Sequence, residues 1–205
     1  MLVNLSVTDF VEKTASDAPV PGGGSIAALA GGIAAGLTEM VANLTIGKKK
    51  YEDVQEEMKT ISEEVVAYKV KLVELVDKDA SSFDDVMKAF KMPKETDEEK
   101  AARTAAIQKG MKYAASVPLD TAKTAAGILD WIEAVVVRGN SNAVTDGAVA
   151  AMMCRTAVLG ALYNVKINLG SIKDEAFVAE VTKEVEELEA RAIAREKAIL
   201  DQVKL

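Results

Sequence analysis

The chain has 205 residues, no histidine and one cysteine, and its 32 acidic residues outnumber its 25 basic residues. Without histidine, a Ser-His-Asp triad, a Cys-His pair and any histidine-ligated metal site are excluded. A single cysteine forms no intramolecular disulfide, which fits a cytoplasmic protein, and an acidic chain with 4% aromatic residues is a poor candidate for binding nucleic acid. The longest uncharged apolar stretch, residues 26–37, is too short to cross a bilayer, and no signal-peptide pattern is present, so no membrane partner is expected.

The first predicted element is a short helix opened by a capping box at residues 6–9, with three apolar residues facing inward: Val7, Phe10 and Val11. A loop of three glycines follows. Ser25 is the expected N-cap of the next helix, which runs to about residue 46 and ends with Gly47 as its C-terminal cap. Because a helix N-terminus offers free N–H groups and partial positive charge, this loop is a candidate ligand site formed by Gly22, Gly23, Gly24 and Ser25.

Three lysines follow the end of that helix, in a chain that is acidic overall. Their pairing with the glycine loop suggests a site for an anionic small molecule, in which the cations are Lys48, Lys49 and Lys50. The alternative interpretations are a tight turn with close packing for the glycines and a solvated surface for the lysines.

Residues 51–90 form the longest periodic stretch, with apolar residues every three or four positions from Val54 to Leu75. This spacing predicts a helix with one buried seam. Asp79 lies on the continuation of the seam, before Phe83. A carboxylate there has to be paired, hydrogen-bonded or facing a cavity, and the alternative is that it fixes the register of the bundle.

The remaining pattern predicts further helices: one from the capping box at 96–99 to about 116, one opened by Pro118 that ends near 138, one ending near 168, and a charged one over 174–203. No segment alternates with a period of two. We therefore expect an all-α fold, a bundle of long antiparallel helices forming one domain over residues 1–205. Sparse aromatics and alanine-rich faces predict a homodimer.

Several other motifs have simple structural explanations. The letters of a dinucleotide fingerprint at residues 22–27 follow a proline-rich segment and no strand, so they do not indicate a nucleotide site. Cys154 lies in an apolar helix and is expected in the core. Asn140, Asn142 and Asp146 cluster near one turn, where turn formation and ligand contact are both plausible roles.

Taken together, the motifs resemble the formiminotransferase-cyclodeaminase C-terminal family. The matching segments cover nearly the whole chain: Pro-x-Pro-Gly-Gly-Gly-Ser at 19–25, Met-Val-Ala-Asn-Leu-Thr-Ile-Gly-Lys-Lys-Lys-Tyr at 40–51, Asp-Lys-Asp-Ala-x-x-Phe at 77–83, Val-Pro-Leu at 117–119, Gly-Asn-x-Asn-x-x-x-Asp at 139–146 and Asn-Val-x-Ile-Asn-Leu at 164–169. Thr145 departs from the serine that often precedes the aspartate in this family, and keeps the hydroxyl.

The resemblance implies an all-helical dimeric enzyme of folate one-carbon metabolism, with no cofactor beyond the tetrahydrofolate substrate and no metal. One implied reaction converts 5-formiminotetrahydrofolate to 5,10-methenyltetrahydrofolate and ammonia. The other is a cyclohydrolase reaction that opens the methenyl compound to 10-formyltetrahydrofolate. Both reactions need an acid/base group, for which Asp79 is the first candidate and Asp146 the second.

Under the same resemblance, the lysines would meet the glutamate tail of the folate, including a polyglutamate tail, and the glycine loop would approach the pterin. Orienting roles fall to Asn43, Asn140 and Asn142. Two rival classes stay open: a non-catalytic folate or anion binder on the same bundle, and a helical interaction protein that binds no folate.

Overall fold

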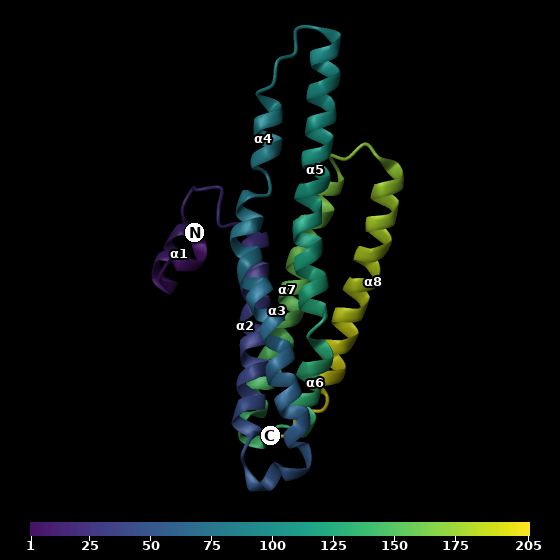
Figure 1. Ribbon diagram of the computed structural model, residues 1–205. Helices are drawn as coiled ribbons and strands as arrows, with labels where there is room; N and C mark the ends of the chain where they lie inside the picture. The colour runs from purple at the N-terminus through teal and green to yellow at the C-terminus, as the bar shows by residue number, and fades with distance from the viewer.

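All 205 residues are described by a computed structural model made of helices and short connections, with no strand (Figure 1). The all-α expectation is confirmed. The long helices are α2 (Gly23–Thr45), α3 (Gln55–Ser81), α5 (Asp97–Ala126), α7 (Val144–Leu169) and α8 (Glu175–Leu200). The shorter elements are α1 (Val7–Ala15), α4 (Asp84–Phe90), α6 (Leu129–Arg138) and the 3₁₀ helices η1 (Leu2–Asn4), η2 (Lys49–Val54) and η3 (Ser141–Ala143).

Helix α2 lies between α3 and α7 and packs closely against both. Gly31 makes this approach possible, because an added Cβ would lie 2.9 Å from Leu72 of α3 and 3.3 Å from Ala157 of α7. Both α2 and the segment Ser141–Leu169 are long and apolar enough to cross a membrane by length and composition alone. At least half of each apolar window is buried inside the bundle, as is usual for core helices of globular proteins.

The predicted seam of α3 is confirmed, since Met58, Ile61, Val65 and Leu72 are fully buried. The helix does not continue to residue 90. It ends at Ser81, and α4 begins after the connection through Phe83. Asp79 therefore lies in the last turn of α3, at the end of the buried seam.

Helix α5 corrects the prediction that Pro118 opens a new helix. It runs without interruption from Asp97 to Ala126, with Pro118 inside it. Proline has no N–H to donate to the carbonyl oxygen four residues earlier, which is that of Ala114. Asn168 of α7 donates its side-chain amide to this oxygen at 2.9 Å and so replaces the missing bond. The capping box of Thr96 and Glu99 is present as predicted.

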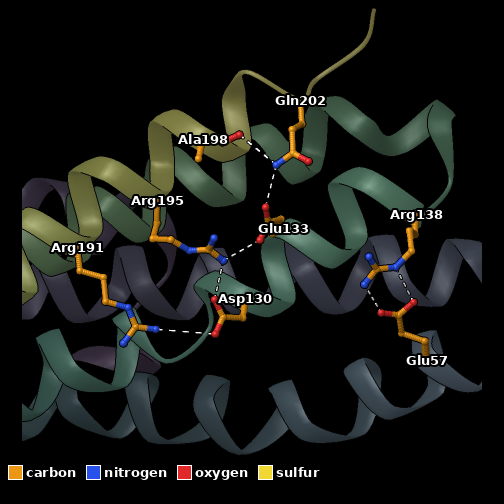
Figure 2. Close-up of polar contacts among 8 residues, drawn as sticks. All are labelled: Glu57, Asp130, Glu133, Arg138, Arg191, Arg195, Ala198 and Gln202. Carbon is orange, nitrogen blue, oxygen red and sulfur yellow. Dashed lines mark hydrogen bonds and ion pairs between the residues drawn. The ribbon is translucent and has the colours of Figure 1, made fainter.

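Polar contacts fasten α6 between α8 and α3 (Figure 2). Arg195 of α8 donates to Asp130 at 2.6 Å and to Glu133 at 2.8 Å, while Arg138 at the other end of α6 pairs with Glu57 of α3. Hydrogen bonds from Gln202 and Arg195 hold the pKa of Glu133 below its usual value. These contacts fix the end of α6, and with it the loop at residues 139–142.

The N-terminal segment differs from the prediction. Ser6 caps α1 and Phe10 is buried, but Val7 and Val11 are 83% and 58% exposed. Their inward orientation is therefore wrong, because α1 lies beside the bundle and only one side of it touches α2 and α3 (Figure 1). The two valines instead line an apolar groove of about 320 Å³ between the N-terminal segment and those helices.

Candidate functional site

The glycine loop opens α2 one turn earlier than predicted. Gly22 is the N-cap and Gly23 the first helical residue, so the prediction of Ser25 as N-cap is wrong. The N-cap glycine has no side chain to cap the helix, and Asp79 approaches the helix start from α3. Ser25 is fully buried, and its hydroxyl lies 2.9 Å from the carbonyl oxygen of Val76 and 3.1 Å from Oδ2 of Asp79.

The carboxylate of Asp79 rests directly on the backbone of Gly24. A Cβ added to Gly24 would lie 2.1 Å from Oδ1 and 2.6 Å from Oδ2 of Asp79, which no real side chain tolerates. Gly24 is thus required by the position of the carboxylate. The negative group also lies at the positive end of the α2 dipole, where backbone N–H groups have no partners within the helix.

Burial raises the pKa of Asp79 above its usual value, and hydrogen bonds from Ser25 partly oppose this rise. A buried carboxyl with a raised pKa spends more of its time protonated at neutral pH, so it can both donate and accept a proton. Perturbed carboxyls of this kind are concentrated in functional sites, although structural networks also produce them.

Asn164 of α7 also belongs to this end of α2 and is absent from the predicted site residues. Its side-chain amide nitrogen lies 3.4 Å from the position of a Cβ on Gly23, and it donates to the carbonyl oxygen of Gly160 at 2.9 Å. The sequence signal was its position in the last family-like segment. Next to it, a surface hollow of about 420 Å³ is lined by Thr14, Pro21, Gly22, Gly23, Ile26, Ala27, Thr156 and Gly160.

The three lysines lie at the opposite end of α2, where Gly47 has a φ of +76° that suits glycine and closes the helix as predicted. All three side chains are exposed. Lys50 donates to the hydroxyl of Ser141 at 3.3 Å, and the backbone N–H of Ser141 donates to the hydroxyl of Tyr51 at 2.9 Å. The hydrogen bonds with Ser141 lower the pKa of Tyr51.

The asparagines also lie toward the lysine end. Asn140 is 4% exposed and holds α2 to the loop: its N–H donates to Thr45 at 2.8 Å, and its side chain donates to the carbonyl oxygen of Leu44 at 2.9 Å. In the structure, Asn140 therefore holds the loop after α6 to the C-terminal end of α2. The side chain of Asn142 is exposed, and Asn43 accepts a hydrogen bond from Ser62 of α3 at 2.8 Å.

The predicted site residues thus form two clusters, one at each end of α2. The glycine-end cluster contains Gly22, Gly23, Gly24, Ser25 and Asp79, and the lysine-end cluster contains Asn43, Lys48, Lys49, Lys50, Asn140, Asn142 and Asp146. Asp146 belongs to the second cluster because it lies in the first turn of α7, which runs antiparallel to α2. With 23 residues, α2 separates the clusters by about 34 Å. Figure 1 shows α2 lying along α3 in the bundle.

Three other candidate features do not form a reactive site. Cys154 is fully buried as predicted, and burial raises its pKa to about 12, so the thiol is not a nucleophile. No group of three His, Cys, Asp or Glu side chains is placed to hold a metal ion. The largest hollow, about 600 Å³ between α4 and α5, is lined by residues of both charges and does not include Asp79.

The fold and the site define an all-helical protein that presents a half-buried, protonatable carboxyl at a glycine-lined helix N-terminus. Comparison with known proteins agrees with the resemblance seen in the sequence. The family model described as Formiminotransferase-cyclodeaminase matches residues 6–187, and the chain belongs to this family.

Two relatives and one solved structure show how far the similarity extends. Methenyltetrahydrofolate cyclohydrolase of Methylorubrum extorquens is 40% identical and is matched over 100% of this chain and 98% of its own length. Formimidoyltransferase-cyclodeaminase of Sus scrofa is 35% identical over 98% of this chain, which spans only 37% of that longer protein. The crystal structure of formiminotetrahydrofolate cyclodeaminase from Thermotoga maritima matches with a TM-score of 0.88 and 34% identity, covering 99% of this chain and 98% of the other.

Proposed function

We propose that this chain is a folate one-carbon enzyme that converts 5-formiminotetrahydrofolate to 5,10-methenyltetrahydrofolate and ammonia. The observation that carries the proposal is the carboxyl of Asp79, held against Gly24 at the start of α2 with a raised pKa. The names of the relatives and of the solved structure support the folate substrate.

The chemistry asks for one proton to move between two nitrogens. N10 attacks the carbon of the protonated formimino group on N5, which gives a tetrahedral carbon carrying an amino group and a protonated N10. Asp79 takes the proton from N10 and delivers it to that amino group, which leaves as ammonia while the N10–carbon double bond forms. The ionised carboxylate then faces a cationic carbon, and opposite charges at short range stabilise each other.

A second candidate is the cyclohydrolase reaction, favoured by the 40% identity to the Methylorubrum extorquens enzyme along the whole chain. Water adds to the methenyl carbon and gives one proton to Asp79. Asp79 returns this proton to N5 as the bond from carbon to N5 breaks, and the remaining hydroxyl proton passes to solvent, which leaves the carbonyl of 10-formyltetrahydrofolate. The two reactions pass through similar tetrahedral carbons, so one carboxyl in one position serves either.

One assay separates the candidates. Purified protein is mixed with 5,10-methenyltetrahydrofolate, and loss of its ultraviolet absorbance is compared with the spontaneous rate, with and without ammonium. Fast loss without ammonium identifies the cyclohydrolase, and loss only with ammonium identifies the cyclodeaminase running in reverse. No acceleration in either condition contradicts both and leaves a non-catalytic folate binder, which a binding titration detects.

The proposal includes a homodimer formed through the outer face of α2, α3 and α7. Val73 of α3 lines a groove with Leu29 of α2, and Thr156 of α7 lines a hollow with Ile26, so the exposed stripes of these helices adjoin. Exposed apolar residues that adjoin on several helices are typical of an interface. The exposed apolar residues of these three helices are Ile33, Met40, Leu44, Val66, Val70, Val73, Val149, Met152, Tyr163 and Ile167.

A dimer also explains how both clusters serve one substrate. Within a protomer they lie about 34 Å apart along α2. If the two α2 helices pack antiparallel across the interface, the lysine end of one protomer lies beside the glycine end of its partner. Asp79 and Asp146 then meet in one site, although they come from different chains.

Light scattering tests the dimer, and a monomer in solution contradicts it. Co-expression of Asp79→Asn with Asp146→Asn tests the shared site, provided that each variant alone is inactive. Mixed dimers then contain one intact site, so about a quarter of the wild-type activity is expected to return. No return of activity in demonstrated mixed dimers contradicts the sharing and leaves the assignment of Asp79 intact.

A further inference from the structure

The hydroxyl of Ser25 faces two acceptors and carries one proton. Its oxygen lies 2.9 Å from the carbonyl oxygen of Val76 and 3.1 Å from Oδ2 of Asp79. A hydroxyl donates one hydrogen bond and accepts others, so Ser25 directs its proton to one of these oxygens at a time. Because the side chain is fully buried, no solvent competes for it.

We propose that Ser25 is a positioning residue whose hydroxyl switches between these two acceptors as Asp79 changes its protonation state. When Asp79 is ionised, Ser25 donates to its Oδ2. When Asp79 is protonated, the carboxyl donates to the Ser25 oxygen, and Ser25 donates to the carbonyl oxygen of Val76. In each state the carboxyl has Ser25 as a hydrogen-bond partner after only a rotation of the hydroxyl. The inference rests on the proposed function only through the acid/base role of Asp79.

The surroundings leave the carboxyl itself little freedom to adapt. Gly24 lies against the carboxyl, so the carboxyl has no room to move toward α2 while the hydroxyl turns. This matters for catalysis because a buried acid must gain and lose its proton without leaving an unsatisfied polar atom in either state. The hydroxyl supplies that match at no cost in rearrangement of the backbone.

Charged groups on the neighbouring elements point elsewhere. The first turn of α2 carries no charged side chain, and Asp77 on α3 accepts from the N–H of Leu2 in η1. On α5, Lys109 acts on Asp85, and Asp120 pairs with Lys71. No charged side chain contributes to the raised pKa of Asp79, so Ser25 is the polar group that adjusts its titration.

The test is a titration of the Asp79 carboxyl in intact protein labelled with ¹³C at aspartate side chains, followed by NMR. The resonance is assigned by its loss in Asp79→Asn. Replacing Ser25 with alanine removes the hydroxyl donor to the carboxylate and keeps the backbone N–H of residue 25. The hydrogen bond lost to the carboxylate is stronger than the one lost in the acid state. We expect the pKa of Asp79 in Ser25→Ala to rise by about one pH unit, and a smaller rise in Ser25→Cys, where a weak donor remains.

Thr38→Val is the matched control. Thr38 lies in the same helix, is fully buried, and donates its hydroxyl to the carbonyl oxygen of Ala34 at 2.8 Å, so its partner is a backbone carbonyl and not a carboxyl. It should lose stability without moving the titration of Asp79. An unchanged pKa in both Ser25 variants, or an equal change in Thr38→Val, overturns the proposal.

The titration is independent of turnover, so it separates this inference from the proposed function. If the carboxyl titrates as expected but Asp79→Asn retains full activity, the switch stands and the catalytic assignment fails. If Asp79 is the acid/base group, Ser25→Ala lowers kcat about tenfold and changes KM less than about twofold, with the pH profile displaced upward by the same amount as the NMR titration.

Discussion

The two ends of α2 differ in the burial and charge of their candidate site residues. At the glycine end, side chains rest directly on the backbone, and the one ionisable group of the cluster, the half-buried Asp79, has a pKa that burial raises. At the lysine end, Lys48, Lys49 and Lys50 are exposed and surrounded by solvent. A buried acid is tuned by its contacts, whereas exposed cations act over distance and are screened by salt.

The difference predicts how each end responds to substitution. Small changes at the glycine end should have large effects, because an added side-chain atom at Gly24 displaces the carboxyl of Asp79. Charge changes at the lysine end should have small effects that depend on ionic strength.

Gly24→Ala should be the most damaging single change. The new Cβ would lie 2.1 Å from Oδ1 of Asp79, so the carboxyl has to leave its place at the start of α2. We expect turnover to fall more than about 100-fold and the free energy of unfolding to drop by about 1–3 kcal/mol. Turnover assays and urea unfolding measure both quantities. Gly170→Ala is the control, since its Cβ would meet only the carbonyl oxygen of Ile167 at 3.5 Å.

Asp79→Asn keeps the shape of the side chain and removes the acid. We expect turnover to fall by about 10²–10⁴-fold, the usual contribution of a positioned acid/base group. Asp146→Asn is the informative partner variant, because Asp146 occupies the other end of α2. If Asp146→Asn loses more turnover than Asp79→Asn, the acid/base group lies at the lysine end of α2 and not at the glycine end.

The stability of Asp79→Asn should depend on pH with a definite sign. The native pKa of Asp79 lies above its usual value, so between the two values the native state binds more protons than the unfolded state. The protonated carboxyl of Asp79 therefore stabilises the wild type. This stabilisation is complete below the unfolded-state pKa and is lost as the pH rises through the native pKa. Unfolding at pH 4 and pH 8 should therefore show Asp79→Asn gaining stability relative to wild type at the higher pH, and a constant difference contradicts the raised pKa.

The periodic pattern of the sequence predicted most of the helices. It did not predict the contacts between helices. The seam of α3 and the capping box of α5 follow from local periodicity and hydrogen bonding. Pro118 was misplaced because local rules put proline in a first turn. They contain no information about Asn168, which lies 50 residues later and satisfies the carbonyl oxygen that Pro118 leaves free.

The site was predicted in the same uneven way. The residue types at both ends of α2 were recognised, and Asp79 was identified because a carboxylate on an apolar seam is costly. The distance between the two ends of α2 could also be inferred from the sequence, since an uninterrupted helix of 23 residues spans about 34 Å. The pairing of Ser25 with Asp79 was not available, because it depends on how the N-terminus of α2 meets the last turn of α3.

Asn168→Ala should cost about 1–2 kcal/mol of unfolding free energy, because the carbonyl oxygen of Ala114 is left without its partner. Adding Pro118→Ala restores a backbone N–H at that position and should recover most of the loss. A double-mutant cycle by urea unfolding measures this coupling. Additive losses would mean that Asn168 stabilises the bundle in some way other than through Ala114.

Replacing Lys48, Lys49 and Lys50 with glutamine should have the smallest effect. Exposed charge pairs contribute about 0–1 kcal/mol each, so we expect KM for a polyglutamylated folate to rise about three- to tenfold with kcat unchanged. Added salt should raise the KM of the wild type toward that of the variant. Lys94→Gln, an exposed lysine between α4 and α5, is the control and should leave KM unchanged.

The length of the glutamate tail then decides which lysines are involved. The lysines of the same protomer lie about 34 Å from Asp79, so only a long tail reaches them from a pterin bound at the glycine end. Lysines of a partner packed antiparallel lie near the pterin and meet the first glutamate. A KM effect that is already present with the monoglutamate therefore supports the shared site. An effect that appears only with several glutamates supports a tail lying along α2 of one protomer, and no effect with any tail length removes the lysines from the substrate site.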